Sequence, residues 1–100
     1  MGEHMHDYTV VPRTDEEKAK TLNRLKRIEG QVRGIQKMVE EDRYCVDILV
    51  QISAIQSALK NVGYSVTERH MNHCVTDAIN KGEGEESIKE LMAVLKQFSK

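Results

Sequence analysis

The fold of this chain is decided by residues 42–80, which read DRYCVDILVQISAIQSALKNVGYSVTERHMNHCVTDAIN. Apolar residues recur here at spacings of three and four, the pattern of one face of a helix. They are Val46, Leu49, Val50, Ile52, Ala54, Ile55, Ala58, Leu59, Val62 and Val66. Asp42 is suited to cap the start of this helix. Gly63 could end it early, but the apolar pattern continues past Gly63 without a proline, so we favour one long helix.

A shorter helix is expected on each side of this central one. The first runs from Thr14 to about Glu41, because its apolar residues share one stripe and Thr14 with Glu17 matches a capping box. The other covers residues 85–98, after a loop in which Gly82 suits the left-handed position that ends a helix. Residues 1–13 show no sustained period and are expected to form a flexible tail before one domain at 14–100. The predicted fold is all-α, a three-helix protomer with one long central helix.

Composition narrows the class of protein. The chain has 100 residues, of which 39% are hydrophobic and 31% charged, as in one small globular domain. No apolar run approaches the roughly 20 residues that a membrane span needs. Two cysteines without a secretory signal favour the cytoplasm, where thiols stay free. The sequence has no glycine-rich substrate loop, so we do not expect an enzyme. A chain this short cannot cover its long apolar stripe alone, which predicts an obligate homo-oligomer.

Three residues form a candidate metal site: Cys45, His70 and Cys74. His70 and Cys74 are four residues apart and share a helix face. Cys45 precedes His70 by 25 residues, or roughly 37 Å along a helix, so one chain cannot close the site. Two antiparallel copies would bring the three together. Soft sulfur donors select Cu(I) or zinc, and three ligands suit Cu(I). Buried cysteines and a surface histidine remain the plain alternative.

Basic residues are concentrated on the expected first helix. They include Arg24, Lys26, Arg27, Arg33 and Lys37. The formal net charge is only −1, so nucleic-acid binding would have to come from such a local patch. Arg24 and Arg27 lie three apart and share a side of the helix. The alternative is a charged face that is merely solvated.

Three motifs closely resemble the CsoR/RcnR family of bacterial metal-sensing transcriptional repressors, in particular its copper-sensing CsoR branch. They are RLKRIEGQVRG at 24–34, DRYC at 42–45 and the pair His70-x-x-x-Cys74. The resemblance spans about residues 18–98 and implies an antiparallel four-helix-bundle dimer that assembles into a dimer of dimers. It implies one Cu(I) per protomer, held by Cys45 of one protomer and by His70 and Cys74 of the other. Tyr44 and Glu90 match positions that orient the histidine by hydrogen bonding.

The resemblance also implies a function. A metal-free homotetramer would bind operator DNA, and Cu(I) would lower that affinity allosterically and derepress copper-resistance genes. The DNA contacts it suggests are Arg24, Lys26, Arg27, Arg33, Lys37 and Lys60. Asn61 stands where some relatives have an arginine, which leaves the exact contacts open. A copper chaperone is a further candidate partner.

Other interpretations remain open at this point. His4 and His6 in the tail leave room for a nickel or cobalt sensor, whereas His73 projects away from Cys74. A copper-buffering protein without a DNA role would explain the cysteines but not the basic residues. A purely structural helical dimerisation module is the third interpretation.

Overall fold

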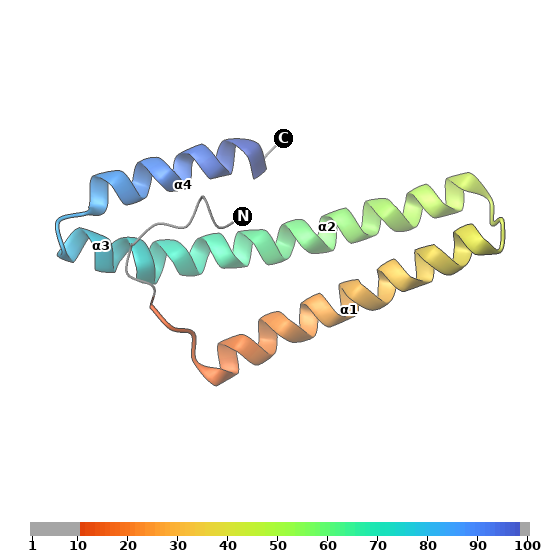
Figure 1. The fold of residues 1–100 in the computed structure, drawn as a ribbon, viewed down its shortest axis with the longest axis horizontal. Helices are drawn as coiled ribbons and strands as arrows, with labels where there is room; N and C mark the ends of the chain where they lie inside the picture. Colours follow the sequence, from red (N-terminus) through yellow and green to blue (C-terminus); the bar gives the residue numbers. More distant parts are fainter. Residues whose placement is uncertain (1–10, 99–100) are drawn as a thin grey trace. The chain divides into compact units, whose positions relative to one another are not determined.

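The structure is a computed structural model that describes residues 11–98, in which it contains helices and no strand. The order is α1 (Asp15–Glu40), α2 (Cys45–Arg69), the π-helix η2 (His70–Val75), α3 (Thr76–Asn80) and α4 (Gly84–Phe98), as Figure 1 shows. Because α2, η2 and α3 follow one another without a break, the prediction of one long central helix running through Gly63 is confirmed. The all-α prediction is confirmed as well. His4 and His6 lie outside the described residues.

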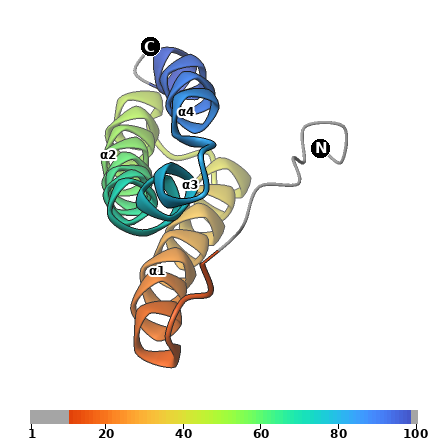
Figure 2. The same ribbon diagram turned by 90° about the vertical axis from the view of Figure 1, so that its left-hand side faces the viewer.

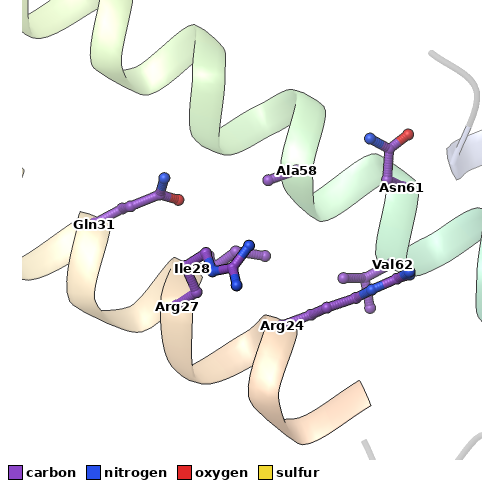
Figure 3. A pocket seen from close by; sticks show the side chains of 7 residues that line it. All are labelled: Arg24, Arg27, Ile28, Gln31, Ala58, Asn61 and Val62. Atoms are coloured by element: carbon purple, nitrogen blue, oxygen red, sulfur yellow. The ribbon is translucent and has the colours of Figure 1, made fainter. Parts of the chain in front are cut away.

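The chain forms two compact units. In the unit of residues 13–66, α1 and the first part of α2 run antiparallel on either side of a short turn (Figure 1). Its buried apolar residues are Ile28 on α1 and Val62 on α2, with 8% and 7% of their surface exposed. These two side chains lie on the sides of α1 and α2 that face each other (Figure 3).

Most of the apolar stripe on α2 is left exposed in the single chain. Leu49 is 61% exposed, Val50 58% and Leu59 49%. Full burial of a side chain of this size stabilises a protein by about 1.5–3 kcal/mol. Packing these exposed side chains against another surface would therefore stabilise the fold considerably. An isolated hairpin of this kind has too little core to be a complete folding unit.

The start of α1 has the capping box that its sequence predicts. The Thr14 side chain accepts a hydrogen bond from the Glu17 N–H at 3.1 Å, and the Glu17 carboxylate accepts one from the Thr14 N–H at 3.0 Å. Two N–H groups that would lack helical partners are therefore satisfied. Asp15, Glu16 and Glu17 also place negative charge at the positive end of the helix dipole.

Asp42 ends the first helix and does not cap the second, so the prediction of an N-cap there is wrong. Its φ of 53° is left-handed. The Asp42 N–H bonds to the Val39 carbonyl at 3.1 Å, and the Arg43 N–H bonds to the Met38 carbonyl at 2.9 Å. This pair of bonds is a Schellman motif, which satisfies the last carbonyls of α1. An aspartate serves here because its short polar side chain tolerates the left-handed conformation.

The second unit joins residues 11–12 to residues 67–98. In it α4 packs against η2 and α3, as Figures 1 and 2 show. Val75, Ala78 and Ser87 form its buried centre, with 2%, 7% and 4% exposure. The turn before α4 is a second Schellman motif, in which Gly82 has a φ of 79°. The Glu83 N–H bonds to the Ala78 carbonyl at 2.7 Å, which confirms the role predicted for Gly82.

Gly84 is required for another reason, the close approach of α3. A Cβ atom at Gly84 would overlap the Ile79 side chain and lie 3.1 Å from its Cα. We expect Gly84→Ala to lower the free energy of unfolding by about 1–3 kcal/mol, the usual cost of overpacking. Urea unfolding at one protein concentration measures this.

Gly34→Ala is the matched control, because nothing lies within 4 Å of a Cβ atom at Gly34. Gly34 lies inside α1, where alanine should be about 1 kcal/mol more stable than glycine. Equal effects of the two substitutions would contradict a steric role for Gly84.

Candidate metal centre and nucleic-acid interface

Two candidate ligands lie in the π-helical segment of the long helix. His70 is the first residue of η2 and Cys74 the fifth, and both side chains are half-buried. In a π-helix the backbone bonds join residues five apart, and such segments are frequent at functional sites. Residues four apart still share a face there, so the imidazole and the thiol lie along one side of the helix. The sequence pattern predicted the shared face but not the change of helix type.

A side-chain hydrogen bond supports the π-helix. The Thr76 hydroxyl donates to the Met71 carbonyl, five residues earlier, at 3.2 Å. A threonine that bonds back to a carbonyl in this way typically bends or loosens a helix. Thr76 therefore helps to set the backbone beside Cys74, a role that apolar periodicity could not reveal.

The third candidate ligand lies at the opposite end of α2. Cys45 is the first residue of α2 and is exposed, and its thiol is free like that of Cys74. Tyr44 immediately before it is 69% exposed, and its carbonyl accepts the N–H of Asp47 at 3.0 Å. The short turn after α1 thus presents the Cys45 thiol to solvent at the start of a helix.

One chain does not assemble the three ligands. Cys45 begins α2 and His70 follows its last residue, a separation of roughly 37 Å along a continuous helix. Among the described residues, no group of three or more His, Cys, Asp or Glu side chains could hold a metal ion. A site that uses all three residues therefore needs a second copy of the chain.

Glu90 lies in the same unit as His70 and Cys74. It is half-buried on α4, the helix that packs against η2. The fold thus brings the helix that carries Glu90 to the π-helical segment, although the two are far apart in the sequence.

The predicted DNA-binding residues all lie on the hairpin unit and are exposed. Those on α1 are Arg24, Lys26, Arg27, Arg33 and Lys37, and Lys60 is on α2. Arg33 forms an ion pair with Glu29 at 3.4 Å, but both side chains are about two-thirds exposed, so it adds little stability. Arg24 and Arg27 form no ion pair with any residue in the described range 11–98. Their charges remain available to an external anion.

A groove of about 490 Å³ lies between α1 and α2 beside these arginines (Figure 3). Its lining comprises Arg24, Arg27, Ile28 and Gln31 of α1 with Ala58, Asn61 and Val62 of α2. Both helices therefore contribute polar and apolar side chains to its lining. The two arginines provide the fork-shaped donors that suit phosphate oxygens. Gln31 and Asn61 add amide groups, and sequence reasoning had not placed them together.

Among the described residues no helix is long and apolar enough to cross a membrane. In its described residues the chain is all-helical, with three candidate thiol and imidazole ligands and a basic groove.

This chain is similar in sequence to known proteins. Residues 17–97 match the model of a family described as metal-sensitive transcriptional repressors. The copper-sensing transcriptional repressor CsoR of Bacillus subtilis is 58% identical over 100 residues, covering 100% of this chain and 99% of the relative. The copper-sensing transcriptional repressor RicR of Mycobacterium tuberculosis is 48% identical over 77 residues, covering 77% of this chain and 74% of the relative.

Two solved structures are also similar. A crystal structure of the copper-sensing repressor CsoR with Cu(I) from Geobacillus thermodenitrificans has a TM-score of 0.88 and 64% identity, covering 93% of this chain and 97% of that one. The nickel-responsive transcriptional regulator InrS has a TM-score of 0.67 and 37% identity, covering 95% and 99%.

This chain belongs to the family of metal-sensitive transcriptional repressors. The resemblance to the copper-sensing branch is confirmed by the identities, and the family's role in repression confirms the expectation of a regulator that is not an enzyme.

Proposed function

We propose that this chain is a Cu(I)-responsive repressor whose metal-free form binds operator DNA and whose copper-bound form releases it. Copper-resistance genes would then be expressed when Cu(I) rises. The observation that carries this proposal is the ligand set Cys45, His70 and Cys74 in a chain 58% identical to a copper-sensing repressor. The protein would act in the cytoplasm, where its thiols stay reduced.

The residues present suit Cu(I). Both thiols are free and the His70 imidazole is only half-buried, so all three donors are accessible. Cu(I) supplies strong bonds to soft sulfur and imidazole donors in a low-coordinate site. Cys45 of one protomer and the partner's His70 and Cys74 would hold one ion per protomer, twice by symmetry. Both thiols must lose their protons to bind, so copper affinity should fall as pH drops.

Tyr44 and Glu90 would support this site without binding the metal. Tyr44 adjoins Cys45, and Glu90 lies on the helix that packs against η2. A hydrogen bond from the free nitrogen of His70 to a carboxylate or phenol fixes the ring and its tautomer. We assign that orienting role to these two side chains.

The exposed stripe of α2 supports the oligomer that the site requires. Two antiparallel hairpins can bury Leu49, Val50 and Leu59 against each other and form a four-helix bundle. The same antiparallel arrangement would place Cys45 beside the partner's His70. Ile88 and Met92 on α4 remain 42% and 54% exposed and provide apolar surface for a dimer of dimers.

The basic groove is the proposed contact with the DNA backbone. Arg24 and Arg27 would bind phosphates, with Gln31 and Asn61 of the groove as neutral donors. Lys26, Arg33, Lys37 and Lys60 would extend the positive surface. Such contacts position the protein on the duplex and make its affinity strongly dependent on salt.

The coupling between the sites follows from their positions in the chain. Cys45 begins the helix directly after the turn that ends α1, and α1 carries the basic residues. When Cys45 of one protomer is bound together with the partner's His70 and Cys74, that turn is held in place and the basic surfaces are repositioned. Coupling is reciprocal, so DNA must weaken copper binding by the same factor, typically about 5–150-fold.

The direct test is anaerobic fluorescence anisotropy on the DNA upstream of the gene, with and without one Cu(I) per protomer. We expect tight binding that Cu(I) abolishes and that Ni(II) and Zn(II) leave intact. Cys45→Ala should keep DNA binding and lose the response to copper, since Cys45 lies outside the basic groove. A response to Ni(II) alone would indicate a nickel sensor like the nickel-responsive relative. An absence of specific DNA binding would contradict the repressor function and favour copper buffering.

Mixing two variants tests whether the site is shared between protomers. Cys45→Ala and Cys74→Ala should each abolish the three-ligand site. After unfolding and refolding the two together, half of the dimers are mixed and each regains one of two sites, so about one quarter of the copper-binding capacity should return. Titration with Cu(I) against a competing chelator measures it.

His70→Ala mixed with Cys74→Ala is the control. In the proposed site one protomer supplies both His70 and Cys74. Every site in a mixed dimer of these two variants therefore lacks one ligand, and no copper-binding capacity should return. Recovery in both mixtures, or in neither, would contradict the shared site.

The role of Arg24 and Arg27 is tested by the salt dependence of DNA binding. Arg24→Gln with Arg27→Gln should flatten the slope of log K against log salt by about 0.9 for each phosphate that the variant no longer neutralises. Lys89→Gln on α4 removes a charge outside the groove and should leave the slope unchanged. An unchanged slope in the double variant would remove the groove from the DNA interface.

A further inference from the structure

Arg69 holds the chain that leads into α1. Its guanidinium donates to the Val11 carbonyl at 3.0 Å and to the Pro12 carbonyl at 2.9 Å. The two bonds link residues 58 and 57 positions apart in the sequence, and Arg69 and Val11 are half-buried. The planar fork of an arginine suits two adjacent oxygens, and bonds from a charged donor are stronger than neutral ones. We call this contact the Arg69 clamp.

The clamp lies directly beside the proposed metal ligands. Arg69 is the last residue of α2, and His70 is the first residue of η2. A displacement of the backbone at His70 is therefore transmitted to Arg69 through a single peptide bond.

The other end of the clamp lies directly before the helix with the basic residues. One residue, Arg13, separates Pro12 from Thr14, the N-cap of α1. Pro12 has a fixed φ, and it restricts the conformation of Val11 before it. The capping box fixes Thr14 to the first turn of α1. Pro12, the Arg69 bonds and the capping box thus each restrain part of the segment from Val11 to Thr14.

The clamp lies close in the sequence to both points where the chain passes from one compact unit to the other. The chain passes from one unit to the other between Pro12 and Arg13, and again within α2 between Val66 and Thr67. Arg69 lies two residues after the second connection and binds the carbonyls at the first.

We propose that Arg69 is a positioning residue that couples the metal-binding segment η2 to α1, in addition to the turn at Cys45. The proposal rests on the proposed repressor function and names a route for its regulation. Arg69 binds neither metal nor DNA in this scheme; it restrains the segment at residues 11–12 that leads into α1. Its loss should weaken the response to copper while leaving both binding sites intact.

Proteolysis tests the clamp without copper or DNA. Residues 1–12 contain no lysine or arginine, so the first trypsin site of the chain is after Arg13. In metal-free Arg69→Gln, release of residues 1–13 should be at least about tenfold faster than in the wild type, since cleavage requires the segment to open locally. Lys96→Gln on α4, which changes the charge equally, should cleave at the wild-type rate. Rates within twofold of each other in all three proteins would overturn the clamp.

Coupling is tested by the DNA affinity with and without Cu(I). Arg69→Gln should keep the metal-free DNA affinity and the Cu(I) affinity within about threefold of wild type, while the ratio of DNA affinities without and with Cu(I) falls at least about tenfold. Arg69→Lys keeps the charge but not the planar fork of donors, so its ratio of DNA affinities should lie between those of the wild type and Arg69→Gln. If circular dichroism shows that Arg69→Gln is unfolded, Arg69→Lys replaces it in this test.

The outcomes separate the clamp from the function on which it rests. An unchanged ratio in Arg69→Gln would overturn the coupling role, even where trypsin shows that the clamp exists. If the wild type binds DNA without responding to Cu(I), both the proposed function and the coupling role are overturned. The trypsin rates would still show whether the Arg69 clamp exists.

Discussion

The structure depends on the apolar stripe of the long helix, which one chain cannot bury. In residues 13–66 the buried apolar side chains are Ile28 and Val62, whereas Leu49 and Val50 are more than half exposed. Apolar burial is the main source of folding stability, so a stable form of this hairpin needs further surface to pack against. The candidate metal ligands favour the same arrangement, because Cys45 and His70 mark opposite ends of α2. The exposed stripe and the proposed metal site therefore both favour pairing with a second copy of the chain.

This shared requirement explains how a small protein can act as a regulator. In the proposed site, ligands at a boundary between protomers would respond to how the protomers are arranged, and the basic residues of α1 would be rearranged with them. No enclosed pocket or separate sensing domain is needed. The π-helical turn at His70–Val75 is consistent with this, since π-helical turns are frequent at functional sites.

Local features compensate where the core is small. The capping box at Thr14, the Schellman motifs at Asp42 and Gly82 and the close packing at Gly84 fix where each helix starts and stops. Each of these features contributes to the free energy of unfolding, from under about 1 kcal/mol to a few kcal/mol. Such amounts matter because the net stability of a domain is only about 5–15 kcal/mol. The Arg69 clamp belongs to this group of local restraints, although it joins segments that are distant in the sequence.

The sequence by itself determined the helices, because apolar periodicity, capping residues and turn glycines act over a few neighbouring residues. The long helix through Gly63, the cap at Thr14 and the turn at Gly82 followed from it, as did the candidate ligands and the basic residues. Only the tertiary structure decided that Asp42 ends α1, that η2 is π-helical, that Gln31 and Asn61 line one groove, and that Arg69 holds Val11 and Pro12. These features depend on a backbone angle, a hydrogen-bond register or a contact between distant residues, and none of these leaves a periodic signal in the sequence.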